Sequence, residues 1–255
     1  MPTPARSHPL EPRLAIVDVA RGLAIAQMIA YHFCYDLNHF SWIHVAMTRD
    51  GGWIAWRTAI VSQFLFLVGV SLALRAGAAA TLARPRTRFW RRWGQIAACA
   101  ALVSFASWWL FGPRLIWFGV LHFVALAQLL LTPLVRFGTA NVLLGAVVLA
   151  AGIFLHFPLF APDALSWIGF SPGKPHTEDF VPLFPWLGVV LLGIGLAHLW
   201  QRSDSSLAQW LRGLRASGWG VLSLLGRWPL TVYILHQPLL FGALALVDAW
   251  YRSRA

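Results

Sequence analysis

The chain has 255 residues, of which 58% are hydrophobic and only 11% are charged, and its mean hydropathy is +0.65. Soluble domains carry about 25% charged residues, so the composition excludes an ordinary soluble protein and predicts an integral membrane protein. The formal net charge of +11 comes almost wholly from arginine, because Lys174 is the only lysine. The arginines lie between apolar runs, where they would anchor a membrane protein, so nucleic-acid binding is not expected.

Apolar runs divide the chain into a cytoplasmic tail at 1–13, one transmembrane domain at 14–250 and a short tail at 251–255. A helix needs roughly 20 residues to cross a bilayer, so the fold class is predicted as an all-α, polytopic transmembrane helix bundle with about seven spans. The segment 207–225 is expected in the membrane interface, and an eighth span is allowed if 216–227 enters the bilayer. The seven predicted spans are 14–37, 53–74, 94–111, 115–135, 139–157, 182–200 and 228–250.

Basic residues predict the orientation of this bundle. A basic stretch at 75–92 separates the second and third spans, and more arginines follow the sixth span. Because arginine and lysine concentrate in cytoplasmic loops, the N-terminus and this stretch are predicted to be cytoplasmic. The Pro- and Gly-rich loop at 158–181 then lies on the opposite side. The arginines of the basic stretch are Arg75, Arg84, Arg86, Arg88, Arg91 and Arg92.

Several common motifs are absent from the sequence. There is no P-loop, GxGxxG, GxSxG elbow or zinc-type spacing, so no metal is expected. The two cysteines, Cys34 and Cys99, fall near opposite faces of the predicted bilayer, which makes a disulfide between them unlikely on geometric grounds. Both are interpreted as buried apolar thiols.

The first predicted span carries an unusual polar face. At about 100° per residue, Asp18, Arg21, His32 and Asp36 fall within roughly 60° of one line on the helix. Charged groups in hydrocarbon cost at least a few kcal/mol each, so this face should point to a protein interior or a wet cavity. A purely structural contact between helices is the alternative. We interpret the face as a functional site.

His32 and Asp36 are four residues apart, so their side chains meet on one helix face. A carboxylate in this position can orient an imidazole and strengthen it as a general base. The other candidates have two interpretations each. His122 is a core histidine or a site residue, His236 before Gln237-Pro238 is a packing or a functional residue, and Asp179 is a helix N-cap or a site residue.

Four blocks carry a resemblance to a known family: DVARGLAIAQMIAYHFCYDL from Asp18, WFGVLHFVAL from Trp117, TEDFVPLFPWLGVVLLG from Thr177 and LGRWPLTVYILHQPLLFG from Leu225. In this order they resemble bacterial membrane proteins that share the catalytic domain of lysosomal heparan-alpha-glucosaminide N-acetyltransferase. The resemblance implies acetyl transfer from cytosolic acetyl-CoA to an acceptor across the membrane. The residues that match the family's motifs are Asp18, Arg21, Gly22, His32, Asp36, Asp179 and His236.

His32 matches the family's motif by its position but departs from the lysosomal enzyme in residue type, because that enzyme has an asparagine there. The catalytic histidine of that enzyme lies further on, in the lumenal segment. His39 and His44 fall in that region here, so His32, His39 and His44 all stay candidates for the base.

The sequence thus predicts an acyl-CoA-dependent N- or O-acetyltransferase of the bacterial cytoplasmic membrane, acting on an amine or hydroxyl of an extracytoplasmic sugar or glycan. Acyl-CoA, the acceptor and membrane lipid are its expected partners, and homo-oligomerisation is left open. A proton-coupled transporter that uses the same buried face is the alternative. Expected catalytic residues are His32, Asp36, Asp179 and His236. Expected contacts for the CoA donor are Arg21, Asp18, Arg86, Arg88 and His122.

Overall fold

The structure is a computed structural model that describes residues 14–82, 86–214 and 219–254. Within these ranges every element is helical, and the predicted tail at 1–13 lies outside them. The α-helices are α1 (Ala15–His39), α2 (Gly51–Leu82), α3 (Arg86–Phe111), α4 (Val120–Leu131), α5 (Ala140–Phe154), α6 (Asp163–Ser166), α7 (Leu183–Arg202), α8 (Ser206–Gly213), α9 (Gly220–Arg227) and α10 (Pro229–Arg252). The 3-10 turns are η1 (Gly112–Arg114), η2 (Thr132–Phe137) and η3 (Pro158–Phe160).

The all-α, polytopic bundle is confirmed, with a difference in the number of apolar spans. In the part of the chain that the structure describes, five helical segments are long and apolar enough to cross a membrane, and they coincide with the second, third, fourth, sixth and last predicted spans. α1 has 25 residues, enough for the roughly 30 Å hydrocarbon core, but its charged face keeps it out of this group. α5 has only 15 residues. The five segments are Gly51–Gly77, Thr87–Arg114, Val120–Phe137, Leu183–Arg202 and Pro229–Arg252.

The predicted basic loop is mostly helical. α2 continues to Leu82 and α3 begins at Arg86, so both helices extend past their apolar runs. The end of α2 is rich in alanine and the start of α3 is rich in arginine, and both residues have a high helix propensity, which explains the extension. Arg88 is exposed on the first turn of α3, whereas Arg84 and the side chain of Arg86 lie outside what the structure describes.

The allowed eighth span does not form in the described residues. α8 and α9 have eight residues each, too few to cross a bilayer. α8 exposes Leu207 and Trp210 beside the basic Arg212, which agrees with the interfacial position expected for this segment.

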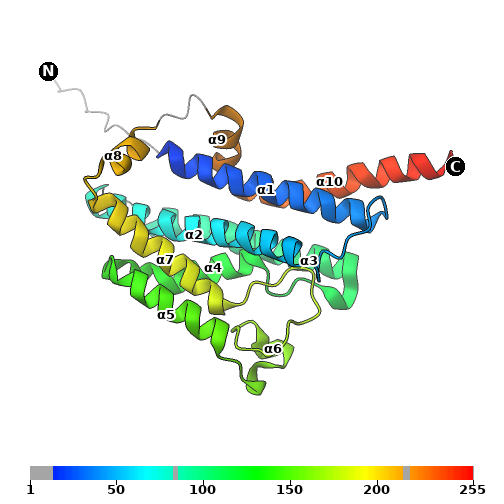
Figure 1. The fold of residues 1–255 in the computed structure, drawn as a ribbon, viewed down its shortest axis with the longest axis horizontal. Helices are drawn as coiled ribbons and strands as arrows, with labels where there is room; N and C mark the ends of the chain where they lie inside the picture. Colours follow the sequence, from blue (N-terminus) through cyan, green and yellow to red (C-terminus); the bar gives the residue numbers. More distant parts are fainter. Residues whose placement is uncertain (1–13, 83–85, 215–218, 255) are drawn as a thin grey trace.

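α1 and α10 lie side by side along one edge of the bundle, with the short α9 against the first turns of α1 (Figure 1). α2 lies between this edge and α7, and α5 packs on the other side of α7 (Figure 1). We call the end of the bundle where α1 begins the proximal end, and the end where α1 finishes the distal end. Neither name assigns a side of the membrane.

Two apolar clusters hold these helices together. The larger one joins α2, α4 and α7 around fully buried side chains such as Leu65, Phe123 and Ile194. The smaller one joins α1 to α2 and to the loop between them, with Ile25 and Met47 among its members. Because α1 packs on α2 through its apolar side, most of its polar face is left to meet α9 and α10.

Candidate active site

The polar face of α1 is buried against α9 and α10. Two glycines let the main chains of α1 and α9 approach closely: a Cβ at Gly22 would overlap the carbonyl oxygen of Leu222, and a Cβ at Gly226 would overlap that of Asp18. Further along, His32 contacts His236 of α10, and Asp36 contacts the next residue, Gln237. The predicted interior position of the polar face is therefore confirmed.

At the proximal end, Arg21 joins three helices. One terminal nitrogen, Nη1, donates to Oδ1 of Asp18 at 2.8 Å and to the Gly226 carbonyl oxygen at 2.9 Å, and Nη2 donates to Oγ of Ser71 on α2 at 3.0 Å. Arg75, one turn further along α2, lies within electrostatic reach of Arg21 and Arg92. This end of the bundle is therefore strongly positive, and Arg21 is held rigidly within it.

At the distal end, Asp36 is completely buried and hydrogen-bonded to α10. Its Oδ1 accepts from Nε2 of Gln237 at 2.7 Å, whereas its Oδ2 has no partner. Oε1 of Gln237 and Nε2 of His236 are also buried without a partner. Three unpartnered polar atoms thus belong to residues that meet at one helix contact, which is rare inside proteins.

His32 and His236 present the same nitrogen to their surroundings. Nδ1 of His32 donates to the Met28 carbonyl oxygen at 2.9 Å, and Nδ1 of His236 donates to that of Tyr233 at 2.7 Å. Because a carbonyl oxygen only accepts, the proton sits on Nδ1 in each ring and Nε2 keeps its lone pair. The ring centroids lie 4.8 Å apart, edge to face.

This geometry differs from the expected orientation of His32 by Asp36. The main-chain carbonyl of Met28 sets the ring of His32 instead, and the carboxylate of Asp36 bonds to Gln237 on α10. An i,i+4 spacing allows a contact between two side chains but does not determine which rotamers they adopt. Gln237 itself was missed by the sequence reasoning, although a polar side chain within an apolar span next to His236 was a signal for it.

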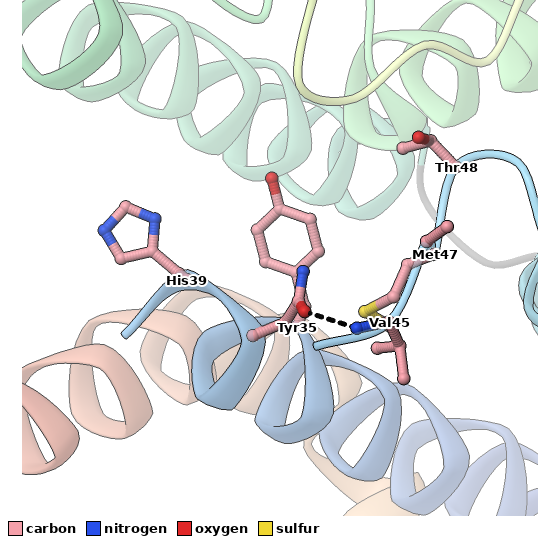
Figure 2. Close-up of a pocket in the computed structure, with 7 residues that line it drawn as sticks. Tyr35, His39, Val45, Met47 and Thr48 are labelled. Carbon is pink, nitrogen blue, oxygen red and sulfur yellow. Dashed lines mark hydrogen bonds between the residues drawn. The ribbon is translucent and has the colours of Figure 1, made fainter. Parts of the chain in front are cut away.

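A pocket of about 250 Å³ opens at the distal end, within one turn of Asp36 (Figure 2). Tyr35, Asn38 and His39 line it from α1, and residues 45–48 of the following loop line its other side. His39 therefore lies at the pocket, on the same helix face as His32 and Asp36. His44 is exposed and does not line the pocket.

Asp179 caps α4 rather than α7. Its Oδ2 accepts from the Val120 amide at 2.8 Å, and Gly119 leaves room for the carboxylate, since a Cβ there would overlap it. α7 begins instead after Pro182. Burial raises the pKa of the Asp179 carboxyl above its ordinary value, while the Val120 amide and the charges of Lys174 and Arg57 partly oppose that rise.

The loop around Asp179 connects to α1 through its neighbour. Glu178 accepts from the Tyr35 hydroxyl at 3.0 Å and pairs with Arg114 at 2.9 Å. Lys174, in the same loop, has a pKa below its ordinary value because of burial and the nearby charge of Arg57. The loop thus covers the distal end with paired charges.

His122 is held on both sides of its ring. Nδ1 accepts from the Gly119 amide at 3.3 Å, and Nε2 lies 3.0 Å from Oγ of Ser104, which itself donates to the Ile116 carbonyl oxygen. His122 therefore fixes the junction of α3 and α4. Among the residues that the structure describes, no group of three or more His, Cys, Asp or Glu side chains is placed to hold a metal ion.

The comparison with protein families agrees with these observations. Residues 13–238 match the model of the family described as "Heparan-alpha-glucosaminide N-acetyltransferase, catalytic". The match begins just before α1 and ends at Pro238, directly after His236 and Gln237. No curated protein and no solved structure matched the chain. The chain belongs to the heparan-alpha-glucosaminide N-acetyltransferase catalytic-domain family.

Proposed function

We propose that this protein moves the acetyl group of cytoplasmic acetyl-CoA to an amine of a sugar or glycan on the opposite side of the membrane. Membership of a family described by an N-acetyltransferase catalytic domain supports the transfer chemistry. The apolar helices support a membrane location, and the arginine bias supports a cytoplasmic N-terminus. The bacterial cytoplasmic membrane is proposed from the resemblance to bacterial members of the family. In this account the proximal end faces the cytoplasm.

The observation that carries the proposal is the group of unpartnered acceptors at the α1–α10 contact. Oδ2 of Asp36, Nε2 of His236 and Oε1 of Gln237 are buried without partners, so this is a place that a ligand or water would fill. All three atoms accept hydrogen bonds. A neutral primary amine offers two hydrogens and keeps a lone pair for attack, whereas a hydroxyl offers only one hydrogen, so the set favours an amine acceptor.

His32 is the proposed general base. The acceptor nitrogen attacks the thioester carbonyl carbon, so that a C–N bond forms while the C–S bond breaks and CoA leaves as a thiolate. The proton lost by the nitrogen passes to Nε2 of His32 and from there to the thiolate. The hydrogen bond from Nδ1 to the Met28 carbonyl keeps Nε2 ready to accept that proton.

The proximal arginines are proposed to bind the phosphates of CoA. Guanidinium groups match phosphate oxygens with paired N–H donors. Arg21 is held by Asp18, and Arg88 is exposed on α3 close to the start of that helix. Arg86 is assigned to the same group from its place in the sequence. His122, expected as a donor contact, would act by shaping the α3–α4 junction.

The test is release of the CoA thiol by the purified full chain in detergent, with acetyl-CoA and three sugars. We expect thiol release with glucosamine. We expect none with glucose, which matches it in size, or with N-acetylglucosamine, because both lack the free amine. Equal release with glucose would overturn the amine assignment. No release with any sugar, together with proton-driven sugar uptake in vesicles, would favour the transporter that the buried polar face of α1 also allows.

A further inference from the structure

The half of α10 that follows Pro238 lies beyond the family match and extends past the end of α1 (Figure 1). Its side chains are largely exposed, with Leu246 and Tyr251 among the most accessible. Its described hydrogen bond and ring contacts to other parts of the chain go to the end of α1 and the start of the α1–α2 loop. This half of α10 is therefore not part of the buried core, and its role has to be sought in its contacts with the loop.

Trp42 is the centre of these contacts. Its Nε1 donates to Oδ1 of Asp248 at 3.0 Å, and its ring lies 6.1 Å from that of Tyr251. Oδ2 of the same aspartate accepts from Nε of Arg252 at 2.7 Å, which fixes the carboxylate. About two turns closer to the bundle, Phe241 packs against the rings of His39 and Phe40.

The segment held in this way leads directly into the wall of the distal pocket. Oδ1 of Asn38 accepts from the Val45 amide at 2.9 Å, so the loop turns back toward α1 just before residues 45–48 reach the pocket. Ser41 lies at the turn with φ of 62°, in the left-handed region that serine rarely adopts. A strained turn of this kind persists only where its surroundings hold it.

We propose that Asp248 and Trp42 form a latch that sets the shape of the distal pocket and thereby determines which acceptors it admits. The inference rests on the proposed function, because it assigns the pocket to the acceptor. A pocket of about 250 Å³ is smaller than the roughly 300–1,000 Å³ of drug-sized sites, so it holds one small unit of an acceptor. The latch acts through the loop, so Asp248 and Trp42 are positioning residues.

The first readout is hydrogen exchange of the loop amides in the full chain, measured by mass spectrometry. Trp42→Phe keeps an aromatic ring, although a smaller one, and removes the N–H donor. Asp248→Ala removes the acceptor. We expect exchange at residues 42–48 to rise roughly fivefold in both variants, the factor that corresponds to one lost hydrogen bond. The matched control is Trp250→Phe, because Trp250 lies on the same helix and packs on Arg254 instead. Unchanged exchange in both latch variants would overturn the proposal.

The second readout separates the latch from the proposed function. Glucosamine at saturating concentration should slow exchange at residues 45–48 in the unmodified chain and do so less in Trp42→Phe. In turnover, Trp42→Phe should raise the KM for glucosamine severalfold while kcat and acetyl-CoA affinity stay near normal. If glucosamine leaves the exchange of 45–48 unchanged, the latch does not serve an acceptor site and the inference fails. If it slows exchange but no thiol is released, the inference stands and the proposed acetyl transfer fails.

Discussion

At the scale of single residues, the main chain prepares two imidazoles for the same task. The carbonyls of Met28 and Tyr233 fix the protons of His32 and His236 on Nδ1 and leave both Nε2 atoms free. Two imidazolium charges at a centroid distance of 4.8 Å would repel each other. The pair is therefore suited to take up one additional proton between its two Nε2 atoms, not two. A shared proton matches a reaction in which one proton leaves the acceptor and one reaches the thiolate.

His32→Ala should therefore cut turnover by about 10²–10⁴-fold, the usual contribution of a general base, with little loss of acetyl-CoA binding. The measurement is steady-state thiol release alongside a CoA titration of the purified variant. His44→Ala is the control, because His44 is exposed and away from the pocket. Near-normal turnover in His32→Ala with an inactive His39→Ala would assign the base to His39, which lines the pocket.

Gln237→Leu removes the described hydrogen-bond donor of the buried Asp36 carboxylate. We expect a loss of roughly 1–3 kcal/mol in the free energy of unfolding, because a buried carboxylate is then left without a partner. Chemical denaturation in detergent measures it, with Gln209→Leu on the exposed α8 as the control. The double variant with Asp36→Asn should cost less than the sum of the single changes. Strict additivity would show that the two side chains do not act as a pair.

Sequence patterns located the polar face of α1 at this scale, but not its partners. Helical periodicity places Asp18, Arg21, His32 and Asp36 on one line, and that is a local property of the chain. Their contacts with Gly226, His236 and Gln237 join residues about 200 positions apart, which no periodicity encodes. For that reason the sequence predicted a contact between Asp36 and His32, whereas Asp36 accepts its hydrogen bond from Gln237 on α10.

At the scale of elements, α9 is the part that a hydropathy reading describes least well. It is eight residues long and gains its place from main-chain contact with α1, not from apolar length. The same limit applies to α2 and α3, which extend into the basic stretch because helix propensity does not stop where hydropathy falls.

Gly226→Ala should separate α9 from α1, since the added Cβ would overlap the carbonyl oxygen of Asp18. Overpacking of this kind costs about 1–3 kcal/mol, and here it also disturbs the bond from Arg21 to the Gly226 carbonyl. Thermal unfolding and acetyl-CoA affinity should both be lowered. Gly220→Ala, in the same helix, has open space around its Cβ and should have little effect on either quantity. Equal behaviour of the two variants would show that close α1–α9 packing is not needed.

At the scale of the whole molecule, the account depends on two chemically different ends. The proximal end gathers Arg21, Arg75 and Arg92, and the distal end holds His32, Asp36 and the pocket. Hydropathy and charge in the sequence predicted most of the helices and this polarity, because both depend on how apolar and basic residues are distributed along the chain. The assignment of the proximal end to the cytoplasmic side of the membrane rests only on the arginine bias.

The most direct test is acetyl transfer across a sealed membrane. Cys34 and Cys99 of the full chain are replaced by alanine, and a cysteine is placed at position 201, which is exposed at the end of α7. The chain is reconstituted into vesicles, and its orientation is measured with an impermeant maleimide. Radiolabelled acetyl-CoA is trapped inside and glucosamine is added outside. The account predicts labelled N-acetylglucosamine outside, made by molecules whose position 201 faces the acetyl-CoA, and almost none with His32→Ala. Product formed only when both substrates are on the same side, or no product in any arrangement, would contradict it.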